Sequence, residues 1–263
     1  MNDFNTSSQV CSKRSVALAS FERPIRAVVI GASGGIGNAL VWALAQNNKV
    51  KCVQALSRAP ITQNQLSVQS DIVDLGNENS IAASANRVAN RIGEIDLIIV
   101  ASGFLHDGSD FQPEKSLRDL NTETLQRAFT INTIGPLLVA KHFLPLLNRE
   151  SKSVFAALSA RVGSIEDNRL GGWYGYRASK AALNMSIRNL AIELTRTHPF
   201  AICLALHPGT VDTKLSRPFA RSVRHASLHD PVSCANNLLD VIDTVSLKNT
   251  GGFYAYDGTQ IPY

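Results

Sequence analysis

The chain of 263 residues lacks the features that mark membrane, secreted and nucleic-acid-binding proteins. No apolar run approaches the ~20 residues that a membrane-spanning helix needs. Its four cysteines are scattered, without the close pairs of a disulfide framework or a zinc site. Aromatic residues make up only 6%, and the excess of 26 Lys+Arg over 21 Asp+Glu forms no polybasic block. We therefore expect a reduced, cytoplasmic protein with no membrane span, no nucleic-acid partner and no metal site.

The composition is that of an ordinary globular protein, with 44% apolar and 18% charged residues. A chain of this length buries a large core without disulfides. We expect one domain over residues 25–263. Residues 1–24 are expected to form a flexible leader, because their apolar stretch is too short and too polar for a secretory signal.

Apolar runs alternate with helix-period segments along almost the whole chain. Strands are predicted over 26–31, 50–56, 67–72, 96–101, 153–158, 201–206 and 252–255. Helices are predicted over about 35–47, 78–91, 121–147, 175–197 and 231–245. This alternation is typical of βαβ units, so we expect an α/β fold with a Rossmann-like, doubly wound parallel sheet in three layers.

A glycine-rich segment joins the first predicted strand to the first predicted helix. It reads Gly31-Ala-Ser33-Gly-Gly35-Ile36-Gly37. Backbone N–H groups and a helix N-terminus in such a turn bind a pyrophosphate, which indicates a dinucleotide site. Two alternatives remain: a tight turn that needs glycine only for packing, and the Gly-x-Ser-x-Gly nucleophile elbow of a hydrolase.

The second predicted strand runs into Arg58 and carries no acidic residue at its end. An acid there would bind the ribose 2′-OH of NAD, whereas the guanidinium fork of an arginine suits a 2′-phosphate. We therefore expect NADP(H) to be favoured over NAD(H). The alternative is a solvated surface arginine.

Tyr176 and Lys180 lie four positions apart (i, i+4) on a predicted helix, and therefore share one face. A nearby ammonium lowers the pKa of a phenol, and the pair then suits proton exchange with a carbonyl or alcohol oxygen. The alternative is an exposed pair with little energetic effect.

Taken together, these motifs resemble the short-chain dehydrogenase/reductase family over roughly residues 25–260. The resemblance is strongest to the C-factor and sniffer-type carbonyl reductases. The order and spacing that carry it are those of the glycine segment, Asn132, Ser159, Tyr176, Lys180 and Pro208-Gly-Thr-Val-Asp-Thr213. The closer likeness comes from Gly163-Ser-Ile, the Gly-Gly-x-Tyr-x-Tyr-Arg run ending at Arg177, and Ala181-Ala-Leu-Asn184.

This resemblance implies a role for each matching residue. Tyr176 would be the acid/base, Lys180 would hold the nicotinamide ribose, and Asn132 would anchor a water of the proton relay. Asp71 would contact the adenine. The cofactor would also contact Ala101, Gly103, Pro208, Gly209, Val211 and Thr213, of which the last two would hold the carboxamide.

The chain departs from the family pattern at the catalytic serine. The expected position holds Ala160, and Ser159 comes one residue earlier. Adjacent strand residues point to opposite faces, so Ser159 serves only if the strand end bulges, with Ser164 as the other candidate. Loss of one such hydrogen-bond donor costs ~10²–10³ in rate.

The segment 214–230 is expected to cover the substrate. Its arginines Arg217, Arg221 and Arg224 share one helical face, which suits either an acidic ligand or plain solvation. Trp173 and Tyr174 are expected to form a pocket wall that favours flat or apolar compounds.

Together these features predict an NADP-dependent reductase of ketones or aldehydes, acting as a homodimer or homotetramer. The alternative is a C-factor-like signalling protein that binds the dinucleotide with little or no turnover.

Overall fold

The computed structural model describes residues 16–61, 65–108, 111–222 and 228–263. A seven-stranded sheet lies at its centre in the order β3-β2-β1-β4-β5-β6-β9, and every neighbouring pair is parallel. The strands are β1 (Ile25–Ile30), β2 (Val50–Ser57), β3 (Val68–Ile72), β4 (Leu97–Val100), β5 (Ser153–Leu158), β6 (Ala201–His207) and β9 (Gly252–Ala255).

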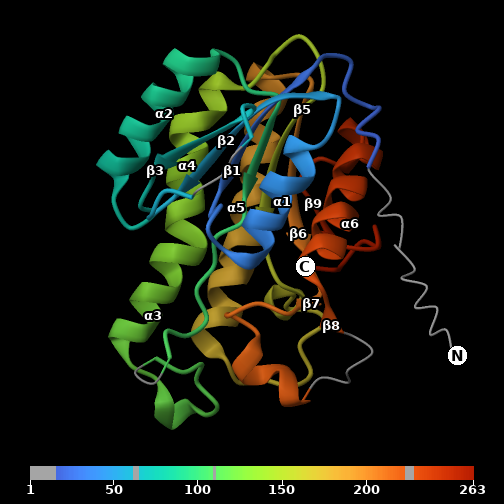
Figure 1. Ribbon diagram of the computed structural model, residues 1–263. Coiled ribbons are helices and arrows are strands. Elements are labelled where there is room, and N and C mark those ends of the chain that lie inside the picture. The colour runs from blue at the N-terminus through green and yellow to red at the C-terminus, as the bar shows by residue number, and fades with distance from the viewer. Residues whose placement is uncertain (1–15, 62–64, 109–110, 223–227) are drawn as a thin grey trace, which may run out of the picture.

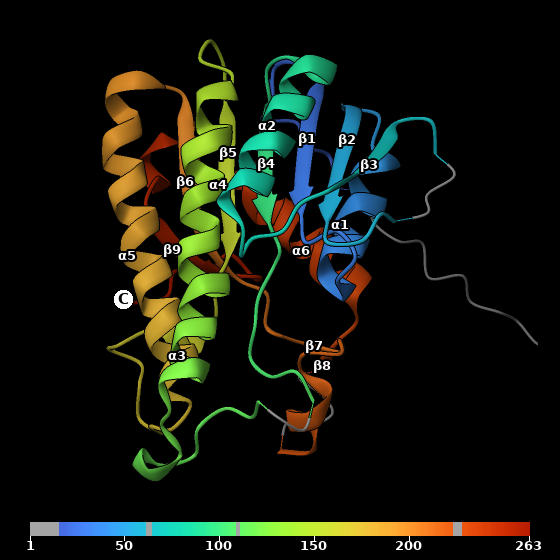
Figure 2. The same cartoon turned by 90° about the vertical axis from the view of Figure 1, so that its left-hand side faces the viewer.

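Helices cover both faces of this sheet (Figures 1 and 2). One face packs against α1 (Gly35–Ala45) and α6 (Pro231–Thr244). The other packs against α2 (Glu78–Ile92), α4 (Gly135–Phe143) and α5 (Tyr174–Thr197). The predicted three-layer, doubly wound α/β fold is therefore confirmed. In the described part of the chain, no helix is long and apolar enough to cross a membrane.

The central strands form because their sequences are continuously apolar. All four residues of β4 and all six of β5 are buried, as expected for parallel strands covered on both sides. Asp96, just before β4, is also buried, and its carboxylate accepts hydrogen bonds from the backbone and guanidinium of Arg26 at the start of β1. This ion pair ties the two central strands together at their amino ends.

The predicted helix over 121–147 is divided. It consists of α3 (Thr122–Phe129), a π-helical turn at Thr130–Ile134, α4, and a 3₁₀ turn at Leu144–Leu146. The π turn ends directly before Gly135, where a Cβ atom would lie 2.9 Å from the side chain of Leu75. Pro136 follows directly, and because the chain is helical through Ile134 and Gly135, its missing N–H removes an interior backbone hydrogen bond. A π turn of this kind often marks a functional site.

The predicted flexible leader is wrong for residues 16–24. Val16, Leu18 and Phe21 are buried in the core beside α6. The backbone N–H groups of residues 19 and 20 donate to the carboxylate of Asp243. Burial of these apolar side chains supplies the driving force that the sequence pattern did not show. Residues 1–15 of the predicted leader lie outside the described residues.

The carboxyl ends of the parallel strands meet at one edge of the sheet. The short strands β7 (Thr210–Val211) and β8 (Leu228–His229) and the 3₁₀ helix η5 (Arg217–Ser222) lie beyond this edge, at the same end of the molecule as α3 (Figures 1 and 2). Ligands of open α/β sheets bind outside this edge. The candidate site residues are therefore sought there.

Candidate active site

The glycine segment forms the turn between β1 and α1. Gly31 has a positive φ of 88°, and a Cβ atom there would lie 2.6 Å from Oγ of Ser102. A Cβ atom at Gly37 would lie 2.1 Å from the Gly31 carbonyl oxygen. These two glycines are therefore required by close packing, in agreement with the packing alternative.

The middle of the same turn serves a different purpose. Ser33, Gly34 and Gly35 are exposed, while Ile36 is half-buried. The N-cap Gly34 makes no side-chain hydrogen bond, so the N–H groups at the start of α1 keep their capacity to bind an anion. An open, uncapped helix N-terminus fits the pyrophosphate of a dinucleotide.

Arg58 follows β2 close to this turn. The Leu56 carbonyl, two residues earlier, accepts hydrogen bonds from the N–H groups of Gly31 (2.8 Å) and Ala32 (3.1 Å). The Arg58 side chain is exposed, and it forms no ion pair within the described residues. It is thus available to a ligand phosphate.

Asp71, on β3, is engaged by two arginines of α2. Its Oδ2 accepts from Arg87 at 2.7 Å and from Arg91 at 3.0 Å. Burial alone would raise the pKa of Asp71, but the hydrogen bond from Arg87 and the charges of both arginines lower it below the usual value. The carboxylate is therefore already paired before any adenine binds.

Asn132 lies in the π turn and clamps the segment after β4. Its Oδ1 accepts from the Phe104 N–H, and its Nδ2 donates to the Phe104 carbonyl, both at 2.8 Å. Nδ2 also donates to Oγ of Ser179 on α5 at 3.0 Å. Because both amide protons are used, the side chain joins this segment to α5. The relay water predicted from the resemblance is a separate role, which stays a prediction.

The two small residues predicted to admit the cofactor lie at the end of β4. Ala101 is half-buried and Gly103 is exposed. A Cβ atom at Gly103 would lie 3.8 Å from Oδ1 of Asn132 and 3.9 Å from Nζ of Lys180. The segment 101–103 therefore bridges the glycine turn, through Ser102, and the catalytic helix, through Gly103.

Tyr176 and Lys180 lie on one face of α5, as predicted. Lys180 is buried, its Nζ donates to the Leu158 carbonyl at 2.7 Å, and it lies 5.9 Å from the centre of the Tyr176 ring. Gly163 packs against it so closely that an added Cβ would lie 2.7 Å from Cβ of Lys180. The lysine is thus fixed between β5 and the phenol.

The ionisation of this pair differs from the prediction. Burial raises the pKa of Tyr176 to about 12 and lowers the pKa of Lys180 to about 7. Desolvation disfavours both charged forms, and at the observed distance it outweighs the attraction between them. In the protein alone, the phenol is therefore fully protonated at neutral pH.

Ser159 does not take the place of a serine at position 160. It is buried, and its Oγ donates to Oδ1 of Asn184 on α5 at 2.7 Å. Ala160 has the next position, after β5 ends. Ser164 is also engaged, since its Oγ accepts the Asp167 N–H at 3.0 Å. Strand alternation explains why Ser159 faces α5, where its hydroxyl proton is used in the bond to Asn184.

The segment after β6 returns to the glycine turn. It begins with Pro208, and Gly209 has a φ of 78° and lies against His229 and Tyr256. Val211 is buried. Thr213 reaches the turn, because a Cβ atom at Gly35 would lie 2.7 Å from Cγ2 of Thr213. These residues thus stand beside the predicted pyrophosphate site.

The arginine stripe of the covering segment is only partly described. Arg217 forms an ion pair with Asp212 at 2.9 Å, which favours simple surface pairing for this residue. The side chain of Arg221 and the whole of Arg224 lie outside the described residues. Tyr174, expected in the pocket wall, is 41% exposed, whereas the Trp173 ring lies edge-on to Tyr176 with 6.2 Å between centres.

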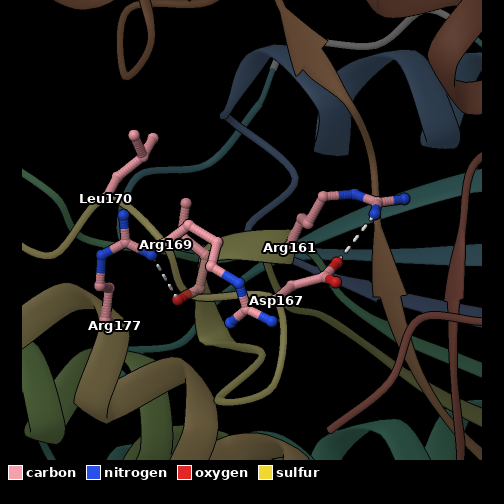
Figure 3. A pocket seen from close by; sticks show the side chains of 6 residues that line it. Arg161, Asp167, Arg169, Leu170 and Arg177 are labelled. Atoms are coloured by element: carbon pink, nitrogen blue, oxygen red, sulfur yellow. Dashed lines mark hydrogen bonds and ion pairs between the residues drawn. The ribbon is translucent and has the colours of Figure 1, made fainter.

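A cavity of about 150 Å³ lies beside the start of α5 (Figure 3). Arg161 pairs there with Asp167 at 2.9 Å, and Arg177 donates to the carbonyls of residues 162, 171 and 172. Its lining is Arg161, Val162, Asp167, Arg169, Leu170 and Arg177. Neither Tyr176 nor Lys180 lines it, so it adjoins the catalytic pair without containing it.

Three residues near the site carried no signal in the sequence. The fold alone brings Glu114 and Phe219 of η5 to Trp173, and His106 to Phe219. No metal centre accompanies them: among the described ranges, no three His, Cys, Asp or Glu residues are placed to hold an ion.

Comparison with known proteins decides the family. The short chain dehydrogenase family model matches residues 26–223. The chain belongs to this family. This short-chain dehydrogenase is therefore an oxidoreductase with the dinucleotide-binding fold, and the hydrolase alternative for the glycine segment is wrong.

Individual relatives agree with this assignment. C-signal of Myxococcus xanthus is 38% identical over 148 residues, covering 56% of this chain and 84% of that protein. The 1-hydroxy-2-glutathionyl-2-methyl-3-butene dehydrogenase of Rhodococcus sp. (strain AD45) is 29% identical over 233 residues, covering 88% and 96%.

Solved structures place the enzyme in the same group. An NADPH-bound carbonyl reductase from chicken fatty liver superposes with a TM-score of 0.79 at 27% identity, covering 92% of this chain and 100% of that one. The carbonyl reductase Sniffer of D. melanogaster has a TM-score of 0.76 at 21% identity, with the same coverage, and shows the shared fold. The predicted likeness to the C-factor and carbonyl reductase group is confirmed.

Proposed function

We propose that this enzyme is an NADP-dependent carbonyl reductase that interconverts a small ketone or aldehyde with its alcohol. The observation that carries the proposal is the convergence of two sites. A Cβ atom at Gly31 of the open anion-binding turn would meet Ala101 and Ser102, and a Cβ atom at Gly103 would lie 3.9 Å from Nζ of Lys180 on the catalytic helix. A cofactor held by the turn would therefore reach the Tyr176–Lys180 pair.

The bound nicotinamide would supply hydride to the carbonyl carbon. Tyr176 would give its phenolic proton to the carbonyl oxygen, which completes the alcohol. Tyr176 is protonated at neutral pH, as reduction requires, because its pKa lies well above 7. Lys180, with its pKa lowered to about 7, is suited to return a proton to the phenolate between turnovers.

Substrate activation would rest mainly on Tyr176. The side chain of Ala160 offers no hydrogen bond, and the Ser159 hydroxyl already donates to Asn184. A second donor to the developing oxyanion would otherwise contribute ~10²–10³ in rate. We therefore expect the enzyme to turn over unactivated ketones slowly.

The preference for NADP(H) would come from Arg58, which is exposed and follows Leu56, whose carbonyl is hydrogen-bonded to the glycine turn. Arg58→Ala should weaken NADPH binding by at least tenfold and leave NADH binding within twofold, because only NADPH carries the 2′-phosphate. Fluorescence titration measures both, with Arg196→Ala on the far end of α5 as a surface-charge control. Equal weakening of the two nucleotides would exclude this role.

Turnover is tested by following NADPH oxidation with a panel of aldehydes, ketones and quinones. Tyr176→Phe should abolish it while NADPH still binds, and the exposed neighbour should tolerate the same change in Tyr174→Phe. Binding without any Tyr176-dependent turnover would instead support the signalling alternative. That alternative draws on the absent serine and on the similarity to C-signal.

We also propose a cytoplasmic location and a homodimeric or homotetrameric assembly. The described cysteines Cys52, Cys203 and Cys234 are unpaired thiols, which suits a reducing compartment. Met185 and Ile192 on α5 are 62% and 52% exposed, which suits burial against another copy. Light scattering gives the assembly, and a monomer at micromolar concentration would contradict it.

A further inference from the structure

The turn that leads into α5 has an unusual backbone. Gly171, Gly172 and Trp173 have φ values of 64°, 63° and 49° in succession. Glycine adopts this left-handed region freely, but a bulky tryptophan does so at a cost of ~1–3 kcal/mol. Such strain persists only where the surrounding structure holds it. Trp173 must therefore be held in this conformation by neighbouring residues.

Glu114 holds the turn from one side. Its carbonyl accepts the Trp173 N–H, and its Oε2 accepts the Gly175 N–H at 3.1 Å. Trp173 is the N-cap of α5 but makes no side-chain cap of its own, so Glu114 caps the helix from a distant loop. Glu114 is 3% exposed and its Oε1 has no hydrogen-bond partner among the described residues. A carboxyl group buried in this way carries a solvation cost that needs a reason.

Arg177 holds the turn from the other side. Its Nε donates to the carbonyls of Gly171 and Gly172 at 3.1 and 3.0 Å. The left-handed turn is thus bonded on both flanks by side chains from different elements. These hydrogen bonds hold its conformation.

The turn directs the Trp173 ring toward other aromatic rings. It lies edge-on to Tyr176 (6.2 Å between centres) and to Phe219 of η5 (5.1 Å). Phe219 in turn lies edge-on to His106 at 5.5 Å. His106 is fixed because its Nε2 is 3.0 Å from the Leu215 carbonyl. Three segments far apart in the sequence thus bring their rings together next to the catalytic phenol.

These rings are not core residues. His106, Trp173, Tyr176 and Phe219 are all only partly buried, whereas the large core side chains have no exposed surface. Aromatic rings attract further aromatic groups edge-on or in offset stacks, and such contacts contribute beyond simple apolar burial. Strained backbone of the kind found at Trp173 clusters at active sites and ligand clamps.

We propose that Trp173, with His106 and Phe219, forms a subsite for an aromatic ring of the carbonyl substrate, and that Glu114 is the positioning residue that holds Trp173 there. This inference rests on the proposed reductase function and specifies its substrate class: carbonyl compounds that bear an aryl group next to the reacting carbon. His106, Trp173 and Phe219 are the specificity-determining residues.

The test compares benzaldehyde with cyclohexanecarbaldehyde, two six-membered rings of similar size. Trp173→Leu should lower kcat/KM for benzaldehyde by about tenfold and for cyclohexanecarbaldehyde by less than threefold, since only the π contacts are lost. Trp173→Phe should restore most of the difference. Equal losses for both aldehydes, or no loss, would overturn the aromatic subsite.

Glu114 is tested with a matched pair of variants. Glu114→Gln keeps an oxygen acceptor for the Gly175 N–H, whereas Glu114→Leu removes it. The leucine variant should lose the preference for benzaldehyde as Trp173→Leu does, and the glutamine variant should keep it, with NADPH affinity unchanged in both. A purely structural residue would lower both aldehyde activities together, and that outcome contradicts the positioning role.

A binding measurement separates this inference from the proposed function. The chain has two tryptophans, so Trp42→Phe leaves Trp173 as the sole indole fluorophore. Benzaldehyde should quench its emission in the NADP⁺-loaded protein, and cyclohexanecarbaldehyde should not. Quenching without any turnover would retain the subsite and reject the reductase. Turnover of benzaldehyde without quenching would reject the subsite alone.

Discussion

At the residue scale, the decisive substitution is the alanine at position 160. Ser159 lies one residue before the position where the family pattern expects a serine. In the structure, the Ser159 hydroxyl donates a hydrogen bond to Asn184. Which face a residue presents at a strand end depends on how the chain leaves the sheet, so spacing alone left this open. The side chain nearest the expected position therefore serves packing between β5 and α5.

Restoring the missing donor gives a direct prediction. Ala160→Ser should raise kcat for an unactivated ketone by tenfold or more, since one oxyanion donor accounts for ~10²–10³ in rate. The NADPH dissociation constant should stay within twofold. Ser159→Ala serves as the control: it should lower stability by about 1 kcal/mol through the unpaired Asn184 and leave kcat nearly unchanged. An unchanged or lower kcat for Ala160→Ser would contradict this account of the site.

The buried lysine predicts a pH dependence of stability. Lys180 has a pKa of about 7 in the folded protein and an ordinary value of 10.5. Between these values the unfolded chain binds more protons, so the free energy of unfolding rises with pH. From pH 7 to 8 the rise from this group is about 1 kcal/mol, and Lys180→Met should remove it.

Urea denaturation of the cofactor-free protein at pH 7.0, 7.5 and 8.0 measures this slope. This range lies below the region where Lys152, with a pKa lowered to about 8, contributes most. The variant Lys51→Met, which changes an exposed lysine, is the control and should keep the wild-type slope. The same slope in Lys180→Met and the wild type would show that Lys180 is protonated normally.

At the scale of elements, the strands and most helices were predictable because each has a local signal. Continuous apolar runs marked β4 and β5, and the glycine segment marked the β1–α1 turn. The π turn at Thr130–Ile134 was not predicted. It lies next to the close contact between Gly135 and Leu75, which is distant in the sequence. The capping of α5 by Glu114 was also missed, as no sequence spacing links residues 114 and 175.

The β1–α1 turn supplies a prediction at this scale. A methyl group in Gly37→Ala would lie 2.1 Å from the Gly31 carbonyl oxygen. Because that oxygen belongs to the backbone, relief of the clash requires a shift of the main chain. We expect a loss of at least about 2 kcal/mol in unfolding free energy, together with loss of NADPH binding. Gly76→Ala is the matched control, because its methyl group meets only Asp74 Oδ1 at 3.4 Å. Similar denaturation midpoints for the two variants would contradict the packing of the turn.

At the scale of the whole molecule, the domain begins before the first strand. Hydrophobic residues of 16–21 complete the layer formed by α1 and α6, which the composition of that stretch did not indicate. Phe21 is 1% exposed, and Nζ of Lys152 lies 5.2 Å from its ring centre. The boundary was misplaced because three separated apolar residues give no periodic pattern.

Removal of this anchor should be costly. Phe21→Ala should lower the free energy of unfolding by about 3 kcal/mol, whereas Leu66→Ala, at a fully exposed site, should change it by less than about 0.5 kcal/mol. Chemical denaturation provides both values. If Phe21→Ala is as stable as Leu66→Ala, the segment does not belong to the core.

The central claim is that one edge of the sheet joins a dinucleotide site to a tyrosine acid. The most direct measurement is a single-turnover experiment: the stoichiometric NADPH complex is mixed with excess benzaldehyde, and nicotinamide fluorescence is followed. The account predicts full loss of the reduced nicotinamide signal with formation of one equivalent of alcohol, and no loss in Tyr176→Phe, which still binds NADPH. Failure of the wild type to bind NADPH, or equal turnover by Tyr176→Phe, would contradict it.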